Sequence, residues 1–240
     1  MPRVALIAAL EREVAPLVKS WKRVERQHEG RRYVFFEHDE TVCVCGGIGV
    51  QAARRAAEAA IALYHPAVVQ SVGFAGALDA SLRVGDIFIP SVVLDTRDGS
   101  RCQLPGGTGT LVTFMEVASA GQKIKLSSSY GAQAVDMEAA GVAAAASAHG
   151  IAMAATKAIS DEADFEIPGM ERFIDHDGRF HTTRFGLFAL LRPWLWPNVA
   201  RLATNSRKAS VALAKHLERL LQNAQPSAVS AAPLSARRHS

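Results

Sequence analysis

Strand-like apolar segments alternate along this chain with stretches in which apolar residues recur three or four positions apart. Residues 4–9 are a continuous apolar run, as expected for a strand covered on both faces, and residues 67–72 and 153–159 are further strand-like segments. Residues 11–20 and 51–64 have helical spacing, and the second of these helices stops near Pro66. This alternation predicts an α/β fold with a mixed, mainly parallel sheet.

The other segments extend the pattern into a single domain. Residues 33–37 and 41–45 predict a hairpin that turns at 38–40. Further strands are expected at residues 84–94 and 111–117, a glycine-rich loop at 97–109, and helices at 137–148, 183–191 and 198–221. We expect one domain over residues 1–224, with a C-terminal helical part at 170–224. Residues 225–240 are rich in Ser, Ala and Pro, so a disordered tail is expected there.

Composition excludes some classes of protein. The chain is 49% hydrophobic and 21% charged, and its formal net charge is +4. Basic residues are scattered, so nucleic-acid binding, which needs a coherent basic stripe, is not expected. Three cysteines and a short apolar start that runs at once into Glu11 predict neither a disulfide framework nor a secretory leader, so we expect a cytoplasmic protein. Cys43 and Cys45 share one strand face and are expected to pack rather than bind metal.

Three acidic residues follow strand-like segments. They are Glu13 after the first strand, Glu138 in AVDMEAA and Asp161 in TKAISDEAD. In open α/β sheets, ligands bind at the carboxyl ends of strands, where such residues lie. Each also has a plain structural interpretation: Glu13 as a solvated first-turn acid, Glu138 as a first-turn acid near backbone N–H groups, and Asp161 as a helix N-cap.

Two groups of small residues stand beside these acids. Gly46, Gly47 and Gly49 lie between a strand and a helix, where the backbone can approach a ligand or simply turn. They lack the spacing of a dinucleotide-binding fingerprint. Gly73, Ala75 and Gly76 are expected to end the strand at residues 67–72 and to leave room for a ligand.

Taken together, these pieces resemble the nucleoside phosphorylase/nucleosidase superfamily, and within it the methylthioadenosine/S-adenosylhomocysteine nucleosidases. The matching segments are IAALEREV, CGGIGVQAA, SVGFAGALDASLRVGDIFIP, AVDMEAAGVA and KAISDEAD. The resemblance implies a three-layer α/β/α domain around a mixed, partly barrel-like sheet. It also implies a homodimer, a small-molecule nucleoside substrate and no cofactor.

The resemblance also implies a role for each acid. Glu13 would activate water, Glu138 would hold the ribose hydroxyls with Met137 against the sugar, and Asp161 would protonate the purine as the glycosidic bond breaks. Asp161 would need burial to raise its pKa for this task. The pocket for the base or the nucleophile would be formed by Gly47, Phe74, Ala75, Gly76, Phe114, Val117 and Ser160.

The chain departs from this family in three places. Phe74 stands where phosphorolytic relatives often carry a phosphate-binding serine, which favours water as the nucleophile; Lys157 stands where a relative carries arginine and leaves an anion-binding role open. Residues 94–111 are a shorter connector than in the nucleosidases, which would open the pocket toward a bulky 5′ group.

The C-terminal part resembles the hopanoid-associated members, which remove adenine from adenosylhopane. Trp194, Leu195 and Trp196 beside Arg192 suit a lipid-tailed substrate or a membrane interface, or else helices packed on the core or at a dimer seam. A solvated loop is the favoured interpretation of His176, Asp177 and His181 over a metal site. Besides the nucleosidase, two hypotheses stay open: a phosphorylase of the same fold, and a non-catalytic or membrane-associated relative.

Overall fold

A computed structural model describes residues 3–166, 169–173, 175, 178–190 and 192–224. The elements follow in the order β1 (Val4–Ala8), α1 (Glu11–Val18), β2 (Lys22–His28), β3 (Arg31–His38), β4 (Thr41–Cys45), α2 (Val50–Tyr64), β5 (Val68–Ala77), β6 (Ile87–Phe88), β7 (Val92–Asp95), β8 (Arg101–Gln103), β9 (Thr110–Thr113), α3 (Ala120–Tyr130), β10 (Ala134–Asp136), α4 (Ala139–His149), β11 (Ala152–Asp161), η1 (Met170–Phe173), α5 (Thr182–Leu190), η2 (Pro193–Leu195) and α6 (Trp196–Ala224).

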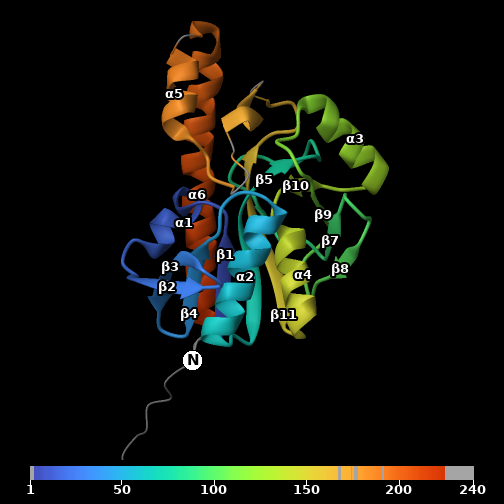
Figure 1. The fold of residues 1–240 in the computed structure, drawn as a ribbon. Coiled ribbons are helices and arrows are strands. Elements are labelled where there is room, and N and C mark those ends of the chain that lie inside the picture. The colour runs from blue at the N-terminus through green and yellow to red at the C-terminus, as the bar shows by residue number, and fades with distance from the viewer. Residues whose placement is uncertain (1–2, 167–168, 174, 176–177, 191, 225–240) are drawn as a thin grey trace, which may run out of the picture.

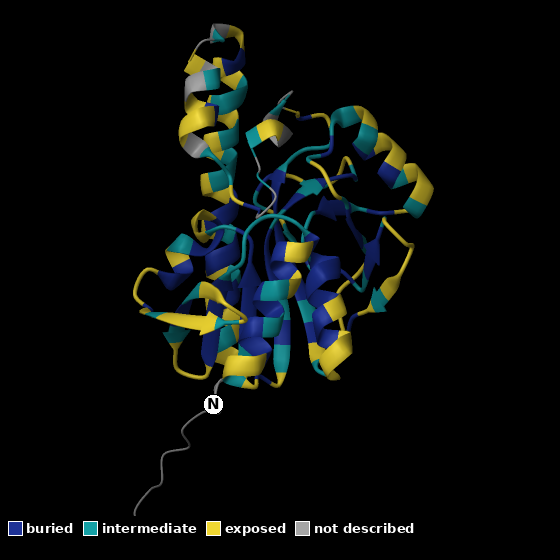
Figure 2. Cartoon of the chain, viewed as in Figure 1, coloured by how far each residue is buried: buried dark blue, intermediate teal, exposed yellow. Residues whose placement is uncertain are grey.

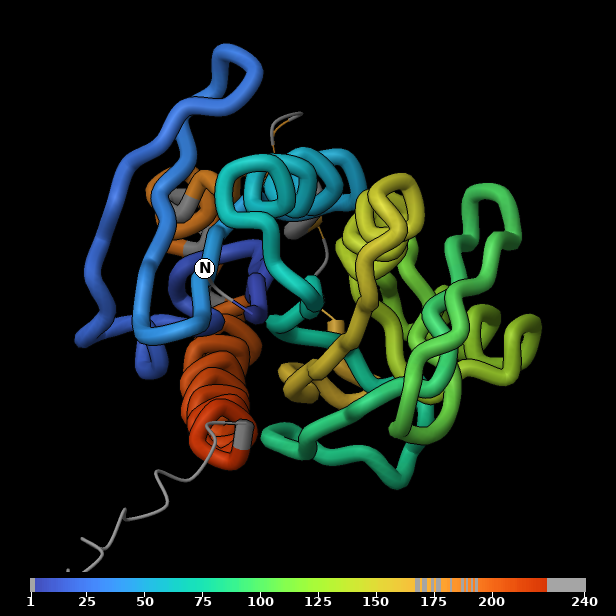
Figure 3. Tube along the Cα trace, turned by 90° about the horizontal axis from the view of Figure 1, so that it is seen from below, coloured from blue at the N-terminus to red at the C-terminus, as the bar shows by residue number. Residues whose placement is uncertain are grey.

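A mixed sheet lies between two layers of helices, as predicted (Figure 1). Alternate residues of β1 show why the strand is apolar throughout. Ala5 and Ile7 pack in the core with α2 and α4, whereas Leu6 and Ala8 pack in the core with α1 and α6. Figure 3 shows α2 and α4 on one side of the sheet and α6 on the other. Cys43, on the neighbouring β4, packs in the core on the α1 and α6 side, as expected.

The centre of the sheet is β5, which pairs with β1 and β11 in parallel and with β10 in antiparallel. The sequence placed the end of this strand before Gly73, and that prediction is wrong. The strand continues through Gly73 and Gly76 because β11 pairs with it as far as Gly76. The two glycines are needed inside the strand for space, since functional side chains lie against them.

Several other predicted elements need correction. The edge strand β2 was missed because most of its residues are exposed, so it lacks an apolar face. The segment 97–109 is not all loop, since it contains β8 paired with β7. The strand expected at 84–94 is broken into β6 and β7, and the one expected at 111–117 ends at Thr113. Helix α3 was also missed, although Ser119 and Gln122 form a capping box at its start.

The C-terminal helices form an arm. The lower half of α6 packs on the sheet through the buried residues Ala209, Leu213, Ala214 and Leu217, and its upper half continues beyond the sheet beside α5 (Figures 1 and 2). The tail expected to be disordered, residues 225–240, lies outside the described residues. Within the described ranges, we find no helix with both the length and the apolar character that crossing a membrane requires.

Candidate active site

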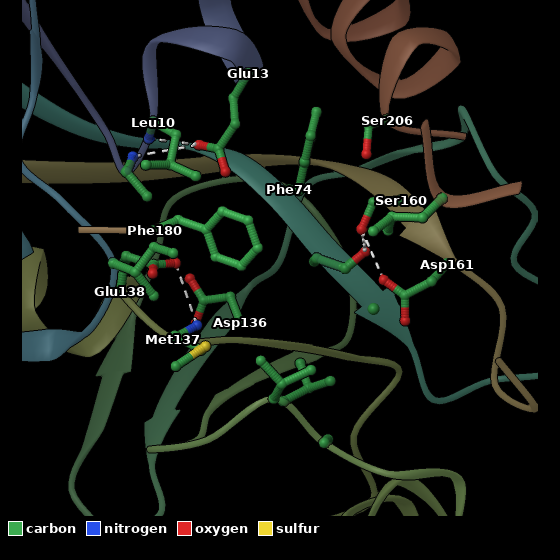
Figure 4. A pocket seen from close by; sticks show the side chains of 18 of the residues that line it. Leu10, Glu13, Phe74, Asp136, Met137, Glu138, Ser160, Asp161, Phe180 and Ser206 are labelled. Atoms are coloured by element: carbon green, nitrogen blue, oxygen red, sulfur yellow. Dashed lines mark hydrogen bonds between the residues drawn. The ribbon is translucent and has the colours of Figure 1, made fainter. Parts of the chain in front are cut away.

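A cavity opens at the carboxyl ends of β1, β5, β10 and β11, where α/β sheets bind ligands (Figure 4). Its walls come from segments far apart in the sequence. Nine of the residues expected at a site line it: Glu13, Phe74, Ala75, Gly76, Val117, Met137, Glu138, Ser160 and Asp161. The fold therefore brings the three acids together around one space.

Glu13 enters the cavity from the first turns of α1 and is almost completely buried. Its Oε2 atom accepts hydrogen bonds from the backbone N–H groups of Ala9 and Leu10, at 3.2 and 3.4 Å. Burial raises the pKa of Glu13, and the nearby positive charge of Lys157 partly opposes that rise. The result is a fixed carboxylate of increased basicity, which suits the abstraction of a proton from water.

Gly73 makes room for this carboxylate. Its φ angle is +137°, and a Cβ atom built on it would lie 2.6 Å from Oε2 of Glu13. The strand-interior glycine therefore has a steric reason that the sequence pattern could not reveal.

Glu138 is held at the start of α4. Its Oε1 accepts a hydrogen bond from Gly49 N–H at 2.9 Å, and its Oε2 accepts one from Met137 N–H at 3.2 Å. The pKa of Glu138 is raised to about 8, mainly by burial and to a smaller extent by repulsion from Asp136. A carboxylate at a helix start is ordinarily ionised easily, but desolvation outweighs the helix dipole at Glu138.

A buried ion pair lies between the two glutamates, and the sequence did not predict it. Lys157 Nζ lies 2.9 Å from Asp136 Oδ2, and both side chains are buried. Asp136 also accepts hydrogen bonds from the Thr113 hydroxyl and from Ala139 N–H. Burial alone would lower the pKa of Lys157, but the surrounding carboxylates, Asp136 above all, raise it. The anion that Lys157 binds in this structure is therefore the carboxylate of Asp136.

Asp161 has a cationic partner, which is a second feature that the sequence did not predict. Lys123, from α3, is only 2% exposed and places Nζ 2.5 Å from Asp161 Oδ2. The same ammonium group donates to the carbonyl oxygens of Glu162 and Phe165, at 2.6 and 3.1 Å. The Ser160 hydroxyl donates to Asp161 Oδ1 at 2.7 Å. Asp161 is therefore held by a lysine and a hydroxyl group, two contacts that the sequence did not predict.

The C-terminal segment supplies another wall. Phe180, Leu202 and Ser206 line the cavity, and Figure 4 shows the Phe180 ring on the same side as Glu13 and Glu138. The guanidinium group of Arg12, also in the lining, lies 5.3 Å from the centre of that ring. This wall is mostly apolar, and it is continuous with the arm through Leu202 and Ser206 on α6.

Two residues assigned to the pocket are not in its lining. Gly47 lies next to it and donates its N–H to the carbonyl of Ala9. Phe114 packs instead in a separate apolar cluster with Leu94, Val112 and Leu126, because β9 ends before it. His176 and Asp177 lie outside the described residues, and His181 Nε2 lies 3.3 Å from Asp175 Oδ2.

Comparison with known proteins places this geometry in context. The phosphorylase superfamily matches the sequence over residues 3–119 and 108–184. No curated protein sequence gives a match. Among solved structures, the nucleosidase MTAN of Helicobacter pylori, as a mutant with 5′-methylthioadenosine in its active site, has a TM-score of 0.70 and 16% identity, over 93% of this chain and 99% of that one.

Two further structures are similar to the same extent. The 5′-methylthioadenosine nucleosidase of Arabidopsis thaliana has a TM-score of 0.70 and 18% identity, over 94% of this chain and 98% of that one. The futalosine hydrolase of Helicobacter pylori has a TM-score of 0.69 and 15% identity, over 92% of this chain and 98% of that one. The fold is therefore shared almost end to end with these chains.

Proposed function

The chain belongs to the phosphorylase superfamily, and from this membership and the cavity we propose that it is a nucleoside N-glycosidase, which hydrolyses the bond between a ribose and its purine base. One observation carries the proposal: Glu13, Glu138 and Asp161 line a single cavity at the carboxyl end of the sheet. Cleavage builds positive charge on the ribose and negative charge on the base, so it needs a carboxylate near the first and a proton donor near the second.

Glu13 is the proposed base that activates water. Two backbone N–H groups fix its position, and burial raises its pKa toward the working range of a general base. In the proposed step, Glu13 takes a proton from water, the water oxygen bonds to the anomeric carbon, and the electron pair of the glycosidic bond leaves with the base.

Glu138 and Met137 are the proposed ribose contacts. Both line the cavity, and Glu138 is anchored by Gly49 and Met137 through their N–H groups. Because its pKa is raised to about 8, Glu138 carries a proton near neutral pH, so it can donate a hydrogen bond to one ribose hydroxyl and accept one from the neighbouring hydroxyl. The thioether of Met137 offers an apolar surface to the sugar.

Asp161 and Lys123 are proposed to act together on the leaving base. Lys123 Nζ lies 2.5 Å from Asp161 Oδ2, and in the proposed step Lys123 passes a proton to Asp161 across this contact. Asp161 would then protonate the departing purine, and the neutral Lys123 would recover its proton from solvent after the base leaves. A buried lysine can release a proton in this way, whereas an arginine cannot.

Water is the proposed nucleophile. Phe74 lines the cavity where a phosphate-binding hydroxyl would be needed, and Lys157 is already paired with Asp136. A phosphate-dependent phosphorylase is the alternative, for which Arg12 and Lys123 would supply the positive charge in the lining. The alternative outside the enzymes is a non-catalytic relative that keeps the same fold.

The proposed substrate is a 5′-substituted adenosine with an apolar 5′ group, such as methylthioadenosine, S-adenosylhomocysteine or adenosylhopane. Phe180 and Leu202 form an apolar wall of the cavity, which supports a substrate with a hydrophobic 5′ substituent. With a lipid-tailed substrate, the protein would associate peripherally and reversibly with membranes. A homodimer, which the family resemblance implies, and the cytoplasmic location expected from the sequence belong to the same proposal.

The experiment follows free base after incubation with methylthioadenosine, inosine and a 5′-alkyl adenosine, with and without phosphate. The proposal expects adenine release from the adenosine derivatives without phosphate. Asp161→Asn should abolish this release while circular dichroism and the melting temperature stay close to those of the wild type. Release that requires phosphate would favour the phosphorylase, and no release from any compound would favour the non-catalytic relative.

A further inference from the structure

The far end of the arm exposes large apolar side chains. Leu190 closes α5 with 63% of its surface exposed, Trp194 in η2 is 71% exposed, and Trp196 at the start of α6 is 52% exposed. We call these three residues and Arg192 the arm tip. Figure 2 shows that the upper part of the arm is largely exposed, in contrast to the buried strands.

The arm has an apolar core that does not depend on the tip residues. Phe165 and Phe185 are buried and pack with Phe173, Phe180, Val199 and Leu202. Leu195 is also buried, so the turn between the helices has its own anchor. Stability of the arm therefore does not explain why Trp194, on the outside of this turn, is a tryptophan.

The arm is also strongly basic. Residues 178–217 contain no Asp or Glu and seven basic residues: Arg179, Arg184, Arg192, Arg201, Arg207, Lys208 and Lys215. Arg201 is paired with Glu162 from the loop after β11, at 2.5 Å. Arg184 is exposed on α5. Arg192 precedes Trp194 by two positions, and its guanidinium group lies 3.9 Å from the centre of the Phe188 ring.

We propose that the arm tip docks on the surface of an anionic phospholipid membrane. Tryptophan prefers the level of the lipid headgroups, where its ring is in an apolar environment and its N–H group stays solvated. Arginines beside it are attracted by anionic headgroups, while their aliphatic stems lie along apolar surface. A few such residues give reversible, peripheral binding rather than insertion.

The position of the arm links this docking to the cavity. Ser206 lines the cavity and Trp196 belongs to the tip, and the two residues lie ten positions apart on α6, which is about 15 Å of helix. A docked tip would therefore hold the cavity near the lipid, within reach of a substrate whose apolar 5′ group stays in the membrane. This last step rests on the proposed function, whereas the docking itself does not.

The three tryptophans of the chain make the docking directly measurable. Trp21 is buried against the body and the other two are at the tip, so quenching by vesicles with brominated acyl chains reports on the tip. No substrate is needed, so the result is separable from a failure of the proposed reaction.

We expect quenching by vesicles of equal parts phosphatidylglycerol and phosphatidylcholine at low salt, and little quenching by phosphatidylcholine alone. The double variant Trp194→Phe/Trp196→Phe, which retains Trp21, should show no quenching.

Co-sedimentation with the same vesicles tests the residues. Trp194→Ser/Trp196→Ser and Arg184→Gln/Arg192→Gln should each lower the affinity for anionic vesicles by roughly tenfold or more. Ile124→Ser, which alters an equally exposed apolar side chain on α3, should bind like the wild type.

Three results would overturn the proposal. They are an absence of quenching on anionic vesicles, equal binding to neutral vesicles, and binding that survives the loss of both tryptophans. A concentration-dependent dimer in sedimentation velocity that Trp194→Ser/Trp196→Ser abolishes, without vesicle binding by the wild type, would assign the tip to a second copy of the chain.

Discussion

Lys157 Nζ lies 2.9 Å from Asp136 Oδ2, and the two side chains are 1% and 0% exposed. The ammonium group of this pair also acts on the candidate base Glu13 and the candidate ribose ligand Glu138: burial raises the pKa of both, and the positive charge of Lys157 partly opposes that rise. Three buried carboxylates therefore share one buried cation, and the ionisation of the whole site depends on it.

Removal of this cation should be costly. In Lys157→Met, Asp136 stays buried without its partner, and the free energy of unfolding should fall by about 3–5 kcal/mol in urea denaturation. Asp136→Asn/Lys157→Met keeps the acceptor for the Thr113 hydroxyl but removes both charges, so it should be more stable than the single variant. A Lys157→Met protein as stable as the wild type would contradict this account of the pair.

Gly73→Ala should displace the candidate base. The new methyl group would lie 2.6 Å from Glu13 Oε2, on a backbone whose φ of +137° is unfavourable for alanine. Because a misplacement of about 1 Å can reduce turnover by about a hundredfold, we expect kcat to fall by that order while KM changes little. Gly121→Ala, in an open position within α3, is the matched control and should leave kcat unchanged. Equal kcat values for the two variants would remove Glu13 from the proposed role.

The proposed proton transfer from Lys123 to Asp161 predicts different outcomes for two substitutions of Lys123. Lys123→Met should lower kcat by about a hundredfold or more, as expected for loss of a proton donor. Lys123→Arg keeps the positive charge, so it should recover stability, but it should not recover turnover because arginine does not release its proton. Lys125→Met, on the exposed side of the same helix, should behave as the wild type. If Lys123→Arg restores both stability and turnover, the lysine only positions Asp161.

Glu138 should make the stability of the fold depend on pH. Its pKa is raised to about 8 in the folded protein, from about 4.5 in an unfolded chain, so the folded state retains a proton that the unfolded state releases. This contribution is fully present below about pH 4.5 and is lost as the pH rises to about 8. Relative to the wild type, Glu138→Gln should therefore become more stable across that window, by at most about 1.4 kcal/mol per pH unit. Urea denaturation of both proteins at several pH values tests this, and a constant difference would contradict it.

The fold could be predicted where burial produces a simple pattern. The strand β1 is apolar on both faces because helices cover both, and its run of apolar residues was sufficient to identify it. The edge strand β2 has almost no buried residue, and α3 buries only Lys123 and Leu126, so neither produces a periodic apolar signal. In β5, Gly73 and Gly76 suggested a strand end, whereas they leave space for Glu13 and Asp161.

The candidate site was predictable only in part for a similar reason. The acids were identified by motif, and the fold does gather Glu13, Glu138 and Asp161 around one cavity. Their partners Lys123 and Asp136 were not recognised, because a charged residue in a sequence gives no sign of being buried. Phe180 was also missed, since it lies between η1 and α5, outside the elements that the apolar pattern predicts.

The origin of the oxygen in the sugar product tests the central claim most directly. The protein is incubated with a 5′-substituted adenosine in water enriched in heavy oxygen, with phosphate of natural isotopic content present, and the sugar product is analysed by mass spectrometry. Hydrolysis through Glu13 predicts a free 5′-substituted ribose with one heavy oxygen at the anomeric carbon, formed at a rate that phosphate does not change and that Glu13→Gln abolishes. A ribose 1-phosphate without heavy oxygen at that carbon, or no cleavage at all, would contradict the proposed function.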